Sequence, residues 1–234
     1  MNRSKQWFAA AMVIVLCGSA HADWKGKGEA GLVFARGNSD TDSLNLKLEM
    51  SQEVDLWKHQ LDMSVLRATT SGSTSADRYQ AAWQSDYNLS DRSFLFGGLH
   101  YDRDKFSGFD YQANATTGFG YKVIDTEQVK LAAQVGAGYR RLKNSLTQKS
   151  SGDAIATAGF GYENQLNAST KVLDTFRVES GSANTLVANF LGLEVKMNHK
   201  LALALGLDLR RNSNPPGALK KTDALTTTNL VYSF

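Results

Sequence analysis

Few residues of this sequence have the types and spacing that enzymes use for catalysis. His59 and His199 fall near expected turns, and only His100 falls inside a segment with strand periodicity. Nucleophilic hydrolysis needs a serine, a base and a group that orients the base, and we expect no serine cluster near His100. Asp102 and Asp104 lie at a loop edge, where paired carboxylates bind cations weakly at best. We therefore expect no catalytic residue, no metal site and no cofactor, with hydrolysis as the remaining alternative.

Other charged residues are spaced by two along segments whose remaining residues are apolar. Lys47 and Glu49, for example, alternate with Leu46, Leu48 and Met50. This period indicates strands with one apolar face and one polar face. The polar faces carry both signs, so they could fill an enclosed lumen with a neutralised network or line a narrow pore. Our candidates for lumen and selectivity residues are Lys47, Glu49, Arg78, Asp86, Lys130, Arg177, Glu194 and Arg210.

The same period of two recurs along most of the chain. In Lys200–Arg211 every second residue from Leu201 to Leu209 is leucine. Most of the segments are about twice as long as ordinary strands, which average about five or six residues. Roughly 13 residues tilted by about 45° rise about 30 Å, enough to cross the apolar band of an outer-membrane barrel. The predicted strands are 24–36, 41–54, 57–70, 77–89, 93–105, 109–123, 128–140, 153–166, 170–180, 184–197, 200–211 and 222–234.

The connections between these strands alternate in length. Short turns, such as the one at 125–127, alternate with longer loops predicted at 71–76, 141–152 and 212–221. Short turns on one side and long loops on the other are typical of outer-membrane barrels. Because the number of strands is even, both termini are expected on the short-turn side, the periplasm.

Aromatic residues gather near the predicted strand ends. Two aromatic girdles indicate two interfaces between water and lipid, and they favour lipid outside the barrel over a soluble barrel or sandwich. In 94–103, where both faces are apolar, we place Leu95, Leu99 and Tyr101 outward. The periplasmic girdle is predicted to comprise Trp24, Trp57, Tyr87, Tyr121, Tyr162, Tyr232 and Phe234, and the outer girdle Phe34, Tyr79, Tyr101, Tyr111 and Tyr139.

The first 22 residues read as a cleaved secretory signal peptide. Arg3 and Lys5 precede a short apolar run, and Ala20-His21-Ala22 supplies small residues at the cleavage positions. The formal net charge of +3 and the lack of a basic run exclude a dedicated nucleic-acid binder. One cysteine, Cys17, excludes a disulfide framework within the chain. We predict a signal peptide at 1–22 and one barrel domain at 23–234.

A Gly-x-Gly-Tyr motif occurs in three consecutive strands, at Gly118–Tyr121, Gly136–Tyr139 and Gly159–Tyr162. Glycine weakens a strand and marks curvature or the close approach of another group. The paired glycines are expected to face inward, where they favour curvature and packing and leave room for long Lys and Arg side chains or water. A phosphate-binding loop is excluded because no helix follows these glycines.

Three segments carry a resemblance to a known family. GNSDTDSLNL at Gly37–Leu46, YDRDKFSGFDYQ at Tyr101–Gln112 and VESGSANT at Val178–Thr185 resemble the salt-induced outer-membrane protein family, a domain of unknown function. The resemblance covers nearly all of the chain after the signal peptide. It implies an outer-membrane barrel and a role in salt or osmotic tolerance, and it supplies no catalytic residues.

The sequence also suggests partners at both ends of the barrel. Basic residues at the expected outer rim could contact the phosphates of lipopolysaccharide, and the candidates are Arg140, Arg141, Lys220 and Lys221. The terminal Val231–Phe234 resembles the signature that barrel-assembly machinery reads, with Phe234 as its last residue. We thus expect an all-β, twelve-stranded antiparallel transmembrane barrel that is not an enzyme, with a small diffusion channel or a barrel hydrolase as alternatives.

Overall fold

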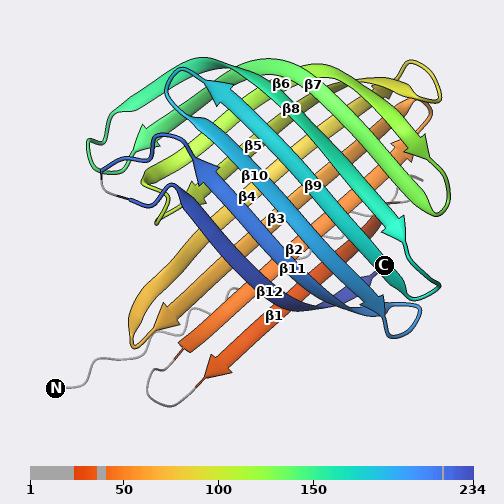
Figure 1. Ribbon diagram of the computed structural model, residues 1–234, viewed down its shortest axis with the longest axis horizontal. Coiled ribbons are helices and arrows are strands. Elements are labelled where there is room, and N and C mark those ends of the chain that lie inside the picture. The colour runs from red at the N-terminus through yellow and green to blue at the C-terminus, as the bar shows by residue number, and fades with distance from the viewer. Residues whose placement is uncertain (1–23, 36–40, 218) are drawn as a thin grey trace.

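The strand periodicity is realised in a closed antiparallel barrel. A computed structural model describes residues 24–35, 41–217 and 219–234, and the described residues form twelve strands in one sheet that β1 and β12 close. Each strand pairs with its neighbours in the sequence (Figure 1). The strands are β1 (Lys25–Ala35), β2 (Thr41–Val54), β3 (Trp57–Thr70), β4 (Ser73–Asn88), β5 (Ser93–Asp104), β6 (Phe109–Asp125), β7 (Val129–Asn144), β8 (Ser150–Gln165), β9 (Thr170–Gly181), β10 (Thr185–Lys196), β11 (Leu201–Asn212) and β12 (Thr222–Ser233).

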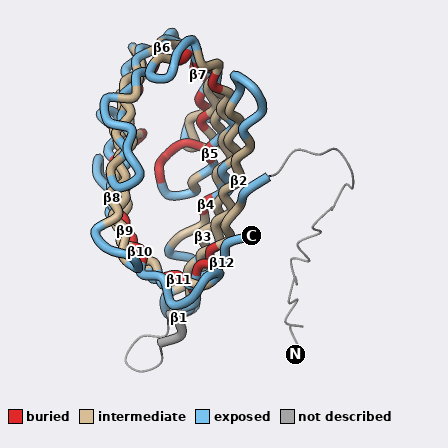
Figure 2. The backbone as a smooth tube through the Cα atoms, turned by 90° about the vertical axis from the view of Figure 1, so that its right-hand side faces the viewer, coloured by how far each residue is buried: buried red, intermediate tan, exposed pale blue. Residues whose placement is uncertain are grey.

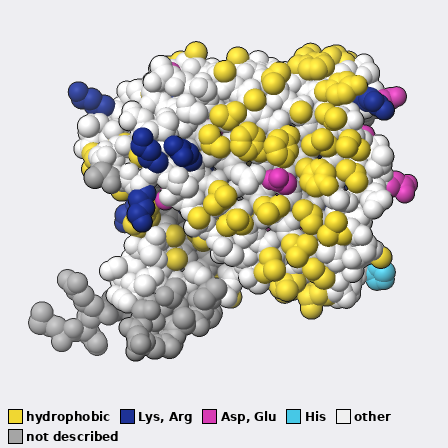
Figure 3. All heavy atoms as spheres, viewed as in Figure 1, with side chains coloured by type: hydrophobic (Ala, Val, Ile, Leu, Met, Phe, Trp, Pro, Cys, Tyr) yellow, Lys and Arg dark blue, Asp and Glu magenta, His cyan; other side chains and the backbone are white. Residues whose placement is uncertain are grey.

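Apolar residues cover the outside of the barrel, and polar residues fill the inside. Leu99 and Leu205 on the outer face are 61% and 45% exposed, whereas Asp102 and Glu179 on the inner face are almost completely buried. Figure 3 shows the hydrophobic side chains as a broad band across the strands. No helix in the described part of the chain is long and apolar enough to cross a bilayer. This distribution, apolar outside and polar inside, is the inverse of that in a soluble barrel and agrees with a barrel whose exterior contacts lipid.

Both ends of the sheet meet at the last residue. The backbone N–H of Gly26 donates to the carbonyl oxygen of Phe234, and that of Phe234 donates to the carbonyl oxygen of Gly26, at 3.0 and 2.9 Å.

The predicted facing of Leu95, Leu99 and Tyr101 is confirmed, because all three are exposed while Phe94 and Phe96 are buried.

Two predicted loops at the long-loop end are wrong in extent. The predicted loop 71–76 is a two-residue hairpin turn, in which Ser71 and Gly72 have positive φ values of 50° and 77°. The predicted loop 141–152 is shorter, because β7 continues to Asn144 and β8 begins at Ser150. Polar residues in these segments continue the hydrogen-bonded ladder beyond the apolar band, where alternation no longer marks the strand. The predicted signal peptide at 1–22 and part of the predicted first loop lie outside the described residues.

The glycine motifs make room for aromatic rings inside the barrel. A Cβ atom on Gly136 would lie 2.9 Å from Cζ of Phe96, and one on Gly118 would lie 2.7 Å from Cε1 of the same ring. The three closest atoms to a Cβ on Gly120 all belong to the ring of Phe94. Packing, one part of the interpretation favoured from sequence, is confirmed, but the space beside Gly118, Gly120 and Gly136 takes phenylalanine rings and not Lys or Arg side chains.

Replacing Gly120 with alanine is expected to destabilise the barrel by about 1–3 kcal/mol, because the new methyl group overlaps the buried Phe94 ring. The loss in the free energy of unfolding should shrink in a Phe94→Ala background, where the ring is absent. Urea titration of the four proteins measures this coupling. Equal losses in both backgrounds would show that the ring is not what the glycine accommodates.

Candidate functional site in the lumen

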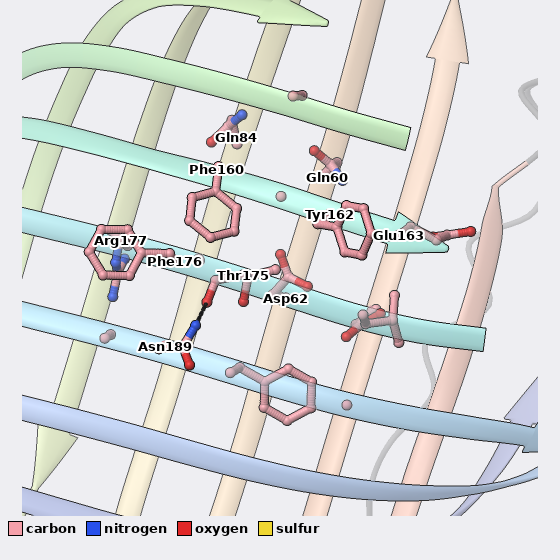
Figure 4. A pocket seen from close by; sticks show the side chains of 18 of the residues that line it. Gln60, Asp62, Gln84, Phe160, Tyr162, Glu163, Thr175, Phe176, Arg177 and Asn189 are labelled. Carbon is pink, nitrogen blue, oxygen red and sulfur yellow. Dashed lines mark hydrogen bonds between the residues drawn. The ribbon is translucent and has the colours of Figure 1, made fainter. Parts of the chain in front are cut away.

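The interior of the barrel contains a large polar cavity of about 990 Å³. Figure 2 views the barrel along its length and shows the strands as an oval ring. Gln60, Asp62 and Gln84 line one wall, and Thr175 and Arg177 line the facing wall (Figure 4).

A network of ion pairs fills the narrow side of the cavity, where β10 approaches β1 and β2. Nζ of Lys27 lies 2.8 Å from Glu49 and 3.8 Å from both Glu29 and Glu194. Lys47 also pairs with Glu49, and its ammonium lies 5.0 Å from the centre of an inward-facing phenylalanine ring. The contacts from Lys27 to Glu194 and from Lys47 to the ring join β10 to β1 and β2, which are not its neighbours in the sheet, so they brace the barrel across its interior.

The cavity ends at a layer of charged side chains near the long-loop end. Arg210 on β11 forms an ion pair with Asp102 on β5, across the lumen. Arg78 on β4 reaches Asp208 on β11 at 3.5 Å and lies 3.9 Å from Asp102. Gln80 donates a hydrogen bond of 3.0 Å to the same Asp102 carboxylate. We name Arg78, Asp102, Asp208 and Arg210 the closing layer, because the cavity wall includes Arg78, Asp208 and Arg210 but neither Asp102 nor the buried polar residues nearer the long loops, which are Gln112, Arg140 and Asn212.

A second buried group lies above the closing layer. Arg140, which is fully buried, donates to a carboxylate oxygen of Asp153 at 3.3 Å and to the backbone carbonyl of Asn184. Asn184 in turn donates a hydrogen bond of 2.7 Å to the side chain of Asn212. Four strands or loops are thus tied together at this level of the barrel.

The loops complete the closure. The backbone N–H of Ser145 donates to the carbonyl of Gly108, and the backbone N–H of Asn214 donates to the side chain of Asn184. A Cβ on Gly108 would lie 2.7 Å from Pro216, so the β5–β6 loop packs against the β11–β12 loop. Inward-facing apolar residues are also buried here, namely Phe109, Leu142, Ile155 and Leu186. The long-loop end is therefore packed with side chains.

The other end of the cavity reaches solvent. Its wall includes Glu53, Asp125 and Lys130, all of them exposed and all close to the short turns. The lumen is consequently asymmetric: a water-accessible chamber opens at the short-turn end and stops at the closing layer.

Every lumen candidate from the sequence lines this chamber. Asp86 accepts a hydrogen bond of 2.8 Å from Gln84, and Arg177 pairs with Glu179 at 3.3 Å. The sequence could not show that two candidates, Arg78 and Arg210, form the closing layer, because their partners lie on distant strands. The full set comprises Lys47, Glu49, Arg78, Asp86, Lys130, Arg177, Glu194 and Arg210.

One candidate for contact with lipopolysaccharide is wrong. Arg140 is 0% exposed and points into the barrel, so it cannot touch a lipid outside. Its neighbour Arg141 points outward and is exposed, as are Lys220 and Lys221 in the β11–β12 loop. Sequence alternation could have separated Arg140 from Arg141, but the predicted end of the strand at residue 140 left both in a supposed rim.

A serine–histidine contact escaped the sequence analysis. His59 lies within β3 and not in a turn, and its Nδ1 is 2.8 Å from Oγ of Ser85 on β4. Nε1 of Trp83 donates to the same hydroxyl at 2.9 Å. Both residues face outward, and the backbone around them is engaged in the β3–β4 ladder. His100 lines the chamber. Among the described residues, no group of three or more His, Cys, Asp and Glu side chains could hold a metal ion.

The fold and its lumen define a class of protein, the closed antiparallel barrels that resemble bacterial outer-membrane proteins. The COG4313 outer-membrane channel of Pseudomonas putida F1 is similar, with a TM-score of 0.51, 12% identity and coverage of 91% of this chain and 95% of that one. The translocator domain of the autotransporter NalP of Neisseria meningitidis (TM-score 0.50, 14% identity, 90% and 87% coverage) and the NanC porin (0.50, 11%, 90% and 98%) are also similar. At these identities the likeness concerns the fold alone.

The family follows from the sequence. Residues 28–234 match the family described as protein of unknown function, DUF481, and the chain belongs to that family. A relative in Escherichia coli K12, the uncharacterized protein YdiY, is 26% identical over 217 residues, which cover 92% of this chain and 85% of the relative.

Proposed function

We propose that this protein is a barrel of the bacterial outer membrane whose polar lumen opens to the periplasm and is closed toward the exterior. In this role it acts as an envelope protein with a filled outer half and serves osmotic or salt tolerance, as the family resemblance implies. The short-turn end then faces the periplasm, in the usual orientation of such barrels.

The closing layer carries this proposal. Arg210 and Asp102 pair across the lumen, and both are more than nine-tenths buried. An open pore would keep such groups in contact with water, whereas here side chains and loops fill the path. Barrels of eight strands are filled by side chains, and barrels of 16–18 strands leave a channel. For twelve strands the strand number does not determine whether the lumen is open, so the side chains inside it do.

Planar-bilayer recording tests the proposal. The folded barrel, residues 23–234, is expected to insert without discrete conductance steps, and a porin of known conductance serves as the positive control. Regular openings of the unmodified protein would favour the second candidate, a small diffusion channel for ions. The observation in favour of that candidate is the size of the chamber, about 990 Å³.

The exposed basic rim supports contact with lipopolysaccharide at Arg141, Lys220 and Lys221. Replacing all three with serine is expected to reduce the lipopolysaccharide that co-purifies with the barrel, because ammonium and guanidinium groups pair with phosphates. Unchanged co-purification, measured by phosphate content, would remove this contact. The proposed partners of the barrel also include the barrel-assembly machinery, through recognition of the terminal Phe234.

Catalysis and cofactors have no part in the proposed function. Ser85 and His59 provide a nucleophile beside a base, but acyl transfer also needs donors for the oxyanion, and the strand ladder occupies the neighbouring backbone groups. A fluorophosphonate probe is expected to leave Ser85 unlabelled. Labelling that Ser85→Ala removes would contradict this expectation.

A further inference from the structure

The outward face of β8, β9 and β10 carries a polar cluster that extends from the short-turn end of β8 into the hydrophobic band. It comprises Tyr162, Asn164, Asp174 and Asn189. Strand alternation fixes their direction, because Asp153 on β8, Glu179 on β9 and Glu194 on β10 are buried inside the barrel and have the opposite parity. Tyr162 and Asp174 are direct cross-strand partners.

Tyr162 and Asn164 lie toward the short-turn end of β8, whereas Asp174 and Asn189 lie further inside the band. Asp174 is followed outward by Phe176 and Val178, and apolar Leu191 is its partner on β10. Figure 3 shows an acidic side chain surrounded by hydrophobic ones on this face. A carboxylate in contact with acyl chains has no solvent to replace its hydration, so such a position is unfavourable unless another group covers it.

The hydrogen bonds within the cluster leave a defined set of groups unused. Nδ2 of Asn189 donates two hydrogen bonds, one to Asp174 Oδ1 at 2.6 Å and one to the backbone carbonyl of Thr175 at 3.1 Å. Figure 4 shows the second of these. Oη of Tyr162 accepts from Asn164 at 3.0 Å, and among the described residues it donates to no side chain. The face therefore offers the Tyr162 hydroxyl and the second Nδ2 proton of Asn164 as donors, beside the second oxygen of Asp174.

We propose that this face binds the same face of a second copy of the chain, forming a two-fold dimer in the membrane. In an isologous interface each group meets its counterpart reciprocally, so the Tyr162 hydroxyl of each copy donates to the Asp174 carboxylate of the other. A lipid acyl chain offers no such donor. A donor and an acceptor side by side are self-complementary, which selects a second copy over an unrelated partner.

The surface beside the cluster suits a close approach of two barrels. The outward residues of β8 next to Phe160 are Ala158, Ala156 and Ala154. Small residues allow backbones to come close in lipid, and polar side chains then hold the interface together. The dimer rests on the membrane location in the proposed function, but not on whether the lumen conducts.

Disulfide crosslinking in native outer membranes tests the dimer. Leu191→Cys places a thiol beside the cluster, and Met63→Cys is a matched control on the opposite wall, since the two side chains are 45% and 46% exposed and lie near mid-strand. The one natural cysteine, Cys17, falls in the predicted leader. Mild oxidation is expected to give a species of twice the mass for Leu191→Cys, several-fold above the control.

Two further variants connect the crosslink to the cluster. Tyr162→Phe removes the proposed donor, together with the oxygen that accepts from Asn164, and Asp174→Leu removes the proposed acceptor. Both should lower the yield of the Leu191→Cys dimer several-fold. Heat-modifiable migration in gels verifies that each barrel has folded, and Asp174→Asn, which keeps an acceptor oxygen, should crosslink more than Asp174→Leu.

The results of the crosslinking experiment distinguish a failure of the dimer from a failure of the proposed function. A folded barrel in the outer membrane that crosslinks no better than Met63→Cys, or that is indifferent to Tyr162→Phe, overturns the dimer alone. A crosslinked species of another mass overturns the second copy in favour of a different protein. Absence of the barrel from the outer-membrane fraction overturns the membrane location and the dimer together.

Discussion

Replacing Arg78 and Arg210 with serine is expected to turn a silent barrel into one that shows discrete openings in a planar bilayer. These two guanidinium groups span the lumen to Asp208 and Asp102 and end the chamber. Serine is too short to cross the lumen, and the released carboxylates would sit in an aqueous path. The openings should also prefer cations, because the layer then keeps its acidic groups and loses its basic ones.

The control for this experiment lies lower in the chamber. Lys47→Ser removes a charge from the narrow side of the cavity without touching the closing layer, so its recordings should remain silent. Openings in both variants would indicate a general loss of barrel integrity. Silence in the Arg78→Ser, Arg210→Ser protein would locate the seal elsewhere, in the packed loops.

Replacing Asp153 with alanine is expected to lower the free energy of unfolding by about 3–5 kcal/mol, the usual cost of leaving one member of a buried ion pair without its partner. Arg140 is fully buried and would keep its charge next to the carbonyl of Asn184. Asp153 also accepts a hydrogen bond of 3.0 Å from the backbone of Ala183, which the variant loses. Urea titration monitored by tryptophan fluorescence measures the change.

Arg141→Ser is the matched control, since Arg141 follows the buried arginine in sequence but is exposed. Its effect should stay within about 0.5 kcal/mol, as for other surface substitutions. A loss below about 1 kcal/mol in the Asp153→Ala protein would mean that water or another group compensates the Arg140 charge, contrary to the packing described above.

The barrel was largely predictable because its strands obey one simple period. Each strand must present apolar residues to one side and polar residues to the other, so the pattern from Leu201 to Leu209 identifies a strand without any tertiary information. The prediction failed where this requirement ends. Beyond the apolar band, residues 71–76 and 141–152 are mostly polar and have no apolar outer face, although Leu142 is buried inside the barrel, and the hydrogen-bonded ladder extends the strands to Ser73, Asn144 and Ser150.

The closing layer was less accessible to sequence reasoning. Alternation placed Arg78 and Arg210 on the inner face but could not pair Arg210 with Asp102, because that contact depends on the curvature and width of the closed barrel. The polar residues on the outer face, including Asp174, break the alternation and were therefore missed. Such exceptions to a regular pattern are where functional contacts are to be sought.

Thiol labelling from one side of the membrane would show whether the lumen is closed toward the exterior. A Gln60→Cys variant carries a thiol inside the chamber, and Arg103→Cys carries an exposed thiol at the long-loop end. In cells that lack general porins, a small charged maleimide added outside is expected to label Arg103→Cys at once and Gln60→Cys only after the outer membrane is permeabilised. Equal labelling of both thiols in intact cells would contradict a lumen that is closed toward the exterior.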